Sequence, residues 1–225
     1  MNCRSRTGQT RAVNLRWRSL ITKIGSLSCW RCRGGVPVAA EVAAALNAPL
    51  DLILARKIGV PFEPELAMGA VVDGSKPLVV RNEKVIRFAG IEERDFNSLC
   101  ESELAEVARR RGRYLGDRKS VEVTGMTAIV IDDGIATGAT TRAALRATRM
   151  RGPKKLVLAV PVAPTDGIVK MRSEADKVVC LETHADFGAI GLYYSDFSQV
   201  LDEEVIDLLA RFPVHGQTRA SQPAL

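Results

Sequence analysis

The stretch TAIVIDDGIATGATTRAALRA, residues 127–147, decides the fold of this chain. Its first residues form an apolar run typical of a buried strand, and two carboxylates, Asp132 and Asp133, follow directly. A loop of small residues comes next, and a helical pattern begins at Thr140. In open α/β sheets, ligands bind beyond the carboxyl ends of the strands. The stretch therefore predicts a strand, a binding loop and a helix, with two acids at the sheet edge.

The loop after the two acids predicts an anion site. Its residues GIATGAT offer backbone N–H groups without bulky side chains, and they lead into a helix N-terminus, where the dipole favours negative charge. Threonine hydroxyls add donors. The two carboxylates can accept hydrogen bonds from vicinal hydroxyls, and the adjacent loop can hold a phosphate. This combination predicts a sugar phosphate as the ligand. The alternative is that Asp-Asp-Gly forms only a turn and a helix cap. We favour binding because strand, acids, loop and helix occur together.

Outward from this stretch, apolar runs alternate with helical patterns. Near-continuous apolar strands separated by helices predict an α/β fold with an open parallel sheet and helices on both faces. The predicted strands are 50–57, 127–131, 155–162 and 176–182, and the predicted helices are 36–48, 92–115, 140–151, 165–174 and 202–211.

The interval from Gly59 to Thr124 is too long for a simple crossover, so we expect an insertion. Within it, KPLVVRNEKVIRFAG (76–90) predicts a hairpin that turns at Asn82–Glu83. The basic tract RRRGRYLGDRKS (109–120) carries two glycines and predicts a mobile lid. The alternative for this tract is the polar end of an exposed helix followed by a turn.

Length and charge set the class of protein. The 225 residues are 46% hydrophobic, enough for one well-buried domain, and no apolar run approaches the ~20 residues of a membrane span. Residues 1–33 hold eight basic side chains and no acid, which leaves 24 basic and 26 acidic residues in the rest of the chain, including its last residues, 213–225. The lack of such an apolar run, and of a charged-then-apolar secretory signal at the N-terminus, predicts a cytoplasmic protein without a membrane partner. Because the body is not basic, a nucleic-acid partner is not expected.

We expect three segments: an irregular basic arm (1–33), one domain (34–212) and a disordered tail (213–225). The arm has no clean helical or strand periodicity, which favours a non-native or misassigned start over nucleic-acid binding or organelle targeting. It contains Cys29 and Cys32 in the sequence CWRC, a C-x-x-C pattern that can be redox-active or can supply two of the four ligands of a zinc site. Two unremarkable thiols are favoured, because a second pair of zinc ligands is missing.

The residues VIDDGIATGAT (130–140) resemble the signature of type I phosphoribosyltransferases. The resemblance implies a glycosyltransferase (pentosyltransferase) of nucleotide metabolism that binds 5-phosphoribosyl 1-diphosphate. Asp132 and Asp133 would contact the ribose hydroxyls. The resemblance further implies that the 5-phosphate is held by Ala136, Thr137, Gly138, Ala139 and Thr140.

Two weaker segments fit the same family, and the resemblance covers roughly Arg33 to Ala210. RGGVPVAAEVAAAL begins at Arg33 and resembles the loop that cradles the diphosphate, where Gly34 and Gly35 allow close backbone approach. Arg56 and Lys57 resemble the Arg-Lys pair beside the diphosphate. One departure is that ITKIGSLSCWRC stands where the family has an apolar strand, which puts the first strand in doubt.

The resemblance implies Mg²⁺ held mainly through substrate oxygens, with Asp132 and Asp133 as the candidate protein ligands, and a nitrogenous acceptor. ETHADFGAIGLYYSDF (182–197) loosely resembles the base-binding region of purine phosphoribosyltransferases, so Phe187 would stack on a purine-like base. The match needs a one-residue gap, and Tyr193 replaces an acid of those enzymes. Core packing of Phe187 is the alternative.

Two other functions stay open: a non-catalytic regulatory module that binds phosphoribosyl diphosphate or a nucleotide, and a non-transferase sugar-phosphate enzyme. Retention of Arg56, Lys57 and both acids favours the transferase. The chain contains neither G-x-x-x-x-G-K-[ST] nor G-x-G-x-x-G, which argues against a P-loop triphosphatase and a dinucleotide dehydrogenase. The expected partners are small-molecule substrates, and a homodimer stays open.

Overall fold

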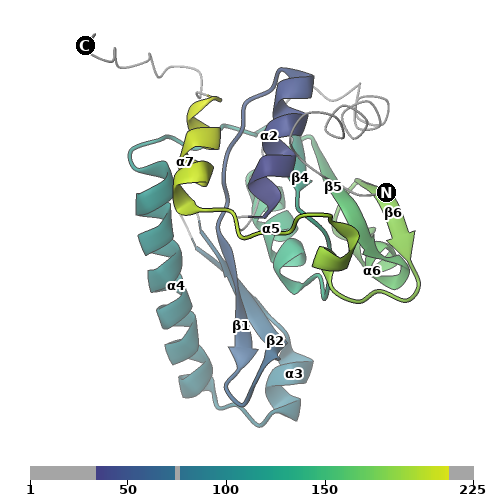
Figure 1. Ribbon diagram of the computed structural model, residues 1–225. Coiled ribbons are helices and arrows are strands. Elements are labelled where there is room, and N and C mark those ends of the chain that lie inside the picture. The colour runs from purple at the N-terminus through teal and green to yellow at the C-terminus, as the bar shows by residue number, and fades with distance from the viewer. Residues whose placement is uncertain (1–33, 74–76, 213–225) are drawn as a thin grey trace.

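A parallel sheet carries the decisive stretch, in a computed structural model that describes residues 34–73 and 77–212 (Figure 1). Its strands β4 (Thr127–Ile131), β5 (Lys155–Pro164) and β6 (Lys177–His184) lie in the order β4-β5-β6. All three are rich in β-branched and apolar residues, and the middle strand β5 is almost wholly buried. Crossover helices join them, as parallel pairing requires. The α/β prediction is confirmed.

Helices cover both faces of this sheet because alternate strand residues point to opposite sides. One face packs Ile129 and Ile131 against apolar residues of α2 (Gly35–Leu46) and α7 (Asp202–Ala210). The other face packs Val130 and Leu158 against α5 (Ala139–Met150) and α6 (Thr165–Met171). These four helices match the sequence predictions closely. None of the helices in the described ranges combines the length and apolar character that crossing a bilayer demands.

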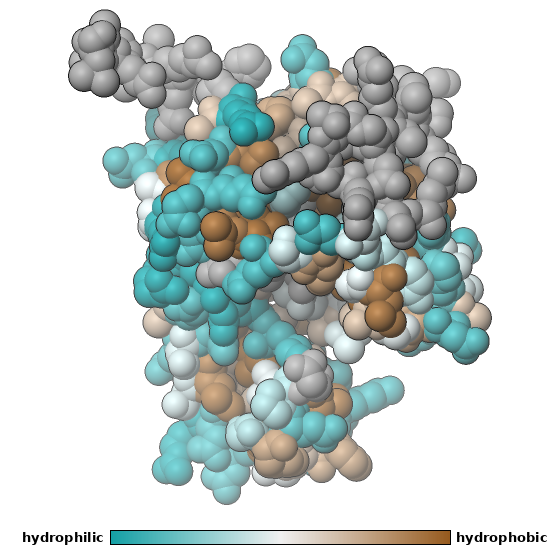
Figure 2. All heavy atoms as spheres, viewed as in Figure 1, coloured by the Kyte–Doolittle hydropathy of each residue, from teal (hydrophilic) through white to brown (hydrophobic). Residues whose placement is uncertain are grey.

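The insertion is a second, antiparallel sheet. Its strands β1 (Ala55–Val60), β2 (Glu63–Val72) and β3 (Leu78–Arg81) lie in the order β1-β2-β3. The helix α4 (Glu93–Leu115) packs on one face and α5 on the other. Figure 1 shows this sheet extending away from α2 and α7, and Figure 2 shows that hydrophilic residues cover the outer side of α4.

Two predictions for the insertion are wrong. The hairpin at Asn82–Glu83 is absent from the described residues 77–90, because Asn82 caps the helix α3 (Glu83–Phe88) with a side-chain oxygen that accepts from the Val85 N–H. The hairpin turn instead joins β1 to β2. The predicted strand 50–57 begins only at Ala55, and it pairs antiparallel with β2 rather than joining the parallel sheet.

The basic tract 109–120 connects α4 to other segments of the fold through its arginine side chains. Arg109–Leu115 form the last two turns of α4, so the prediction of a lid is wrong there. Arg111 pairs with Asp73 at the end of β2. Arg118 donates to the backbone carbonyls of Leu50, Leu209 and Phe212, which ties α7 to the segment between α2 and β1.

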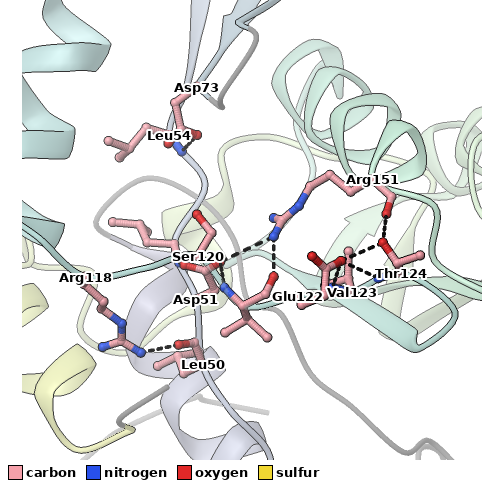
Figure 3. Close-up of polar contacts among 12 residues, drawn as sticks. Leu50, Asp51, Leu54, Asp73, Arg118, Ser120, Glu122, Val123, Thr124 and Arg151 are labelled. Carbon is pink, nitrogen blue, oxygen red and sulfur yellow. Dashed lines mark hydrogen bonds and ion pairs between the residues drawn. The ribbon is translucent and has the colours of Figure 1, made fainter. Parts of the chain in front are cut away.

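A buried carboxylate joins the same region (Figure 3). Asp51 is 2% exposed, and its two oxygens accept the backbone N–H groups of Leu52 (2.8 Å) and Val121 (2.9 Å). A guanidinium nitrogen of Arg151, beyond the end of α5, lies 3.8 Å away. Burial raises the pKa of Asp51, against the opposing effect of these donors. The carboxylate therefore links the segment before β1, the loop before β4 and the end of α5.

An ion pair in the last turn of α5 gives a testable pH dependence. Two guanidinium N–H donors of Arg149 lie 2.9 Å from the carboxylate of Asp176, and this pairing lowers the pKa of Asp176. A lowered pKa stabilises the fold above the ordinary value near 3.8, and that stability is lost as the pH falls through the folded-state pKa.

We therefore expect Asp176→Asn to lower the free energy of unfolding at pH 7 by about 0.5–1 kcal/mol, a small effect because both side chains are about 40% exposed. The difference from wild type should shrink as the pH falls below about 4. Urea unfolding between pH 7 and pH 3 measures it, with Asp117→Asn on the exposed turn after α4 as control. A difference that is constant over this range would contradict the linkage.

Candidate functional site

The two acids that follow β4 lie in different surroundings. Asp132 is 1% exposed, and its oxygens accept hydrogen bonds from the Asp133 N–H (3.0 Å) and from the Thr141 hydroxyl (3.2 Å). Because Thr141 belongs to the first turn of α5, Asp132 ties the loop to the helix. Asp133 is only half-buried. Asp133 is thus the more accessible of the two carboxylates.

The loop presents the N-terminus of α5. Ile135 is buried, and its N–H donates to the Val162 carbonyl (3.1 Å), which anchors the start of the loop. Ala136 and Thr137 are exposed. Gly138 caps the helix with a φ of 75° and no side-chain hydrogen bond. The first N–H groups of an α-helix have no partner within the helix, so this end can take an anion.

The backbone conformation at Gly138 favours glycine, because its positive φ disfavours other residues. A Cβ there would lie 2.8 Å from the Cε atom at the flexible end of the Met171 side chain. Ala139 and Thr140 form the first turn that follows, and Thr140 is 8% exposed. The five predicted phosphate-loop residues are therefore contiguous at one helix end.

The start of α2 meets the two acids. A Cβ placed on Gly34 would lie 2.1 Å from an Asp133 carboxylate oxygen. This contact joins segments far apart in the chain, and a side chain at position 34 would have to displace the Asp133 carboxylate. Gly35 follows as the first, buried residue of α2. Arg33, the remaining predicted residue of this segment, lies outside the described residues, as do Cys29 and Cys32.

Arg56 and Lys57 lie on opposite faces of the antiparallel sheet. They are neighbours on β1, where successive side chains alternate. Arg56 forms an ion pair with Glu103 of α4. Lys57 shares its face with Ala55, which packs with α5 residues. The structure thus places Lys57 on the side of α5, and it turns Arg56 toward α4.

The segment after β6 adjoins the acids. The Tyr194 hydroxyl donates to the Asp133 carbonyl, and a Cβ on Gly134 would lie 2.9 Å from the Ile190 side chain. Tyr194 follows the short 3-10 helix η1 (Ile190–Tyr193), which lies against β5. This hydrogen bond has no local signal in the sequence, because its two residues lie 61 positions apart.

Phe187 belongs to an aromatic column and not to the interior of the sheet. Its ring stacks on Tyr193 with centroids 5.0 Å apart and planes 15° apart. The Tyr193 ring also meets His184, with centroids 4.4 Å apart. Phe187 is half-buried. The column is connected through the backbone to Tyr194, because Tyr193 directly precedes that residue.

The carboxylates of Asp132 and Asp133 could bind a hard cation such as Mg²⁺ only together with oxygen atoms of a bound substrate. Within residues 34–73 and 77–212, no group of three or more His, Cys, Asp and Glu side chains is arranged to hold a metal. Mg²⁺ is commonly bound through one or two carboxylates together with substrate phosphates and water. Asp132 and Asp133 fit that pattern.

Comparison with known proteins gives one consistent result. Residues 32–197 match the family model described as "Phosphoribosyl transferase domain". Two Mycobacterium tuberculosis proteins, from strains H37Rv and CDC 1551 and each named "Putative phosphoribosyl transferase", are 45% identical over 179 residues. The match covers 80% of this chain but 40% of each relative, so the chain spans less than half of their length.

A solved structure resembles the whole chain. The crystal structure of the protein TT1426 from Thermus thermophilus has a TM-score of 0.78 and 32% sequence identity. The match covers 95% of this chain and 100% of that one.

Proposed function

Because this chain belongs to the phosphoribosyl transferase domain family, we propose that it transfers a phosphoribosyl group from 5-phosphoribosyl 1-diphosphate to a nitrogenous acceptor. A purine-like base is the candidate acceptor, and diphosphate is the leaving group. We assign this activity to residues 34–212. One observation carries the proposal: Gly34, the Asp133 carboxylate and the open N-terminus of α5 meet at one edge of the parallel sheet.

Each part of this edge suits one part of the ligand. Asp133, with Asp132 beside it, accepts hydrogen bonds from the ribose hydroxyls. The N–H groups from Ala136 to Thr140 hold the 5-phosphate. The backbone at Gly34 and Gly35 approaches the diphosphate, with Lys57 as the candidate cation. Phe187 stacks on the acceptor.

The proposed reaction needs charge stabilisation more than a nucleophile. Displacement at the anomeric carbon develops positive charge on the sugar, and the nearby carboxylates stabilise it. Mg²⁺, held by Asp132 and Asp133 with substrate oxygens, would neutralise the departing diphosphate. The fixed loop and the start of α2 orient the donor so that the acceptor can attack in line.

The contact at Gly34 yields a prediction. In Gly34→Ala the new methyl group displaces the Asp133 carboxylate, and we expect binding of 5-phosphoribosyl 1-diphosphate to weaken by about 10- to 100-fold, since a hydrogen bond to a charged group contributes about 1.5–3 kcal/mol. Isothermal titration calorimetry with Mg²⁺ present measures the dissociation constant. The control is Gly112→Ala on α4, where a Cβ meets nothing within 4 Å. Equal affinity of the two variants for 5-phosphoribosyl 1-diphosphate would show that Gly34 does not contribute to binding it.

A product assay tests the function. The purified chain is incubated with Mg²⁺, 5-phosphoribosyl 1-diphosphate and a panel of purines, pyrimidines and other nitrogenous acceptors, and new ribonucleotides are detected by mass spectrometry. A ribonucleotide that needs both substrates supports the transferase. Tight binding of the diphosphate without any product would contradict it and favour the regulatory module. Absence of binding would contradict both.

A further inference from the structure

The segment assigned to the acceptor is acidic. From Val178 to Ala210 the chain contains no Lys or Arg. The same interval holds Glu182, Asp186 and Asp196 before α7 begins, and His184 is its only histidine. A carboxylated acceptor normally requires Arg or Lys, which pair with carboxylates through charged hydrogen bonds. The acceptor segment supplies neither.

Glu182 and His184 lie together at the carboxyl end of β6. They are two residues apart on one strand, so their side chains share a face. The His184 Nε2 atom lies 3.8 Å from a Glu182 oxygen, and about a third of each side chain is exposed. Nε2 is itself buried and has no hydrogen-bond partner in the part of the chain that the structure describes. The Tyr193 ring holds the imidazole in place.

The basic side chains of neighbouring helices are held by acids. The helix α6 packs against β6, and its Lys170 is held by Asp166 at 2.6 Å. On α5, Arg146 is held by Glu174 at 2.7 Å. Within residues 34–73 and 77–212, a carboxylate near Glu182 would therefore face like charge without a compensating cation from these two helices, which costs affinity. An N–H donor would instead meet a charged acceptor, the stronger kind of hydrogen bond.

We propose, resting on the transferase function above, that the acceptor is an uncharged heterocycle bearing ring or exocyclic N–H donors, and that Glu182 selects it against carboxylated heterocycles. Glu182 accepts the N–H groups of the acceptor. His184 lies beside the Glu182 carboxylate, with Nε2 3.8 Å from a carboxylate oxygen, and positions it. The aromatic column of Phe187, Tyr193 and His184 borders the plane in which the acceptor lies.

The test compares two acceptor classes with the same donor. Adenine and guanine represent the uncharged class, and orotate and nicotinate the carboxylated class. With Mg²⁺ and 5-phosphoribosyl 1-diphosphate, we expect ribonucleotides from the first class and at least 100-fold lower kcat/KM for the second. Glu182→Gln should lower kcat/KM for adenine by about 10-fold, because a charged hydrogen bond becomes a neutral one. Glu204→Gln on the exposed side of α7 is the matched control.

Separate readouts distinguish the two proposals. Calorimetry of 5-phosphoribosyl 1-diphosphate alone tests the transferase function, and both Gln variants should bind it as tightly as wild type. Donor binding together with efficient use of orotate or nicotinate would overturn the acceptor class and keep the function. An unchanged kcat/KM in Glu182→Gln would overturn the role of Glu182. If no product forms, ligand-observed NMR with the donor present decides: binding of carboxylates as tight as that of bases, or of neither class, overturns the proposal.

Discussion

The double variant Asp132→Asn with Asp133→Asn is expected to lower kcat/KM for phosphoribosyl transfer by about 10³-fold. A hydrogen bond to a charged group contributes about 1.5–3 kcal/mol, and each 1.4 kcal/mol is a factor of ten in rate or affinity. Under the proposed ribose assignment, losing both carboxylates removes two such acceptors from the ribose hydroxyls. Under the same proposal it also removes the negative charge that stabilises the sugar in the transition state. Initial rates measured by mass spectrometry give kcat/KM.

The single variants should differ, because the two acids differ in burial. Asp133 is half-buried and touches the start of α2, whereas Asp132 is buried and bonded to Thr141. We expect Asp133→Asn to account for most of the lost affinity for 5-phosphoribosyl 1-diphosphate, measured by calorimetry. Glu204→Gln again serves as the control. A double variant within threefold of wild type would refute the ribose assignment.

Asp51→Ala is expected to lower the free energy of unfolding by about 3 kcal/mol, the cost of leaving buried donors unpaired. The substitution removes the acceptor of two backbone N–H groups, those of Leu52 and Val121, and the neighbour of Arg151 (Figure 3). For a domain of this size the melting temperature should fall by about 6–12 °C. Three segments lose a common anchor, so the effect should exceed that of an ordinary surface change.

Thermal unfolding followed by circular dichroism, with urea unfolding for the free energy, measures this change. The matched control is Asp117→Ala in the same region, where the side chain is exposed, and it should fall within about 0.5 kcal/mol of wild type. Equal melting temperatures for the two variants would mean that the buried carboxylate does not anchor the fold.

The errors of the sequence predictions have local causes. Asn is common both in turns and at helix N-caps, and Asn82 resembled the first while the structure uses it as the second. Apart from Asp51, the run from Leu50 to Ala55 is apolar, so its pattern did not show where pairing begins. Asp73 lies 19 residues beyond Leu54 and decides this, because its carboxylate and N–H take up the backbone groups of Leu54 just before β1.

The decisive stretch was predictable because its signals are local. An apolar run, two acids, small loop residues and a helical pattern each act within a few residues, and β4, the loop and α5 follow them closely. The opposite outward directions of Arg56 and Lys57 also follow from strand alternation once β1 is known. The class of fold and the position of the acid pair were therefore readable from the chain alone.

Contacts between distant segments were not readable in this way. The approach of Gly34 to Asp133, the bond from Tyr194 to the Asp133 carbonyl and the pairing of Arg56 with Glu103 each join elements far apart in the chain. None of them leaves a periodic signal, because each depends on how the two sheets pack around α5 and on how the start of α2 and the segment after β6 approach Asp133. The sequence by itself determined which residues are candidates for the site. Only the tertiary structure decided which of them lie in contact, because those contacts join segments that are far apart in the chain.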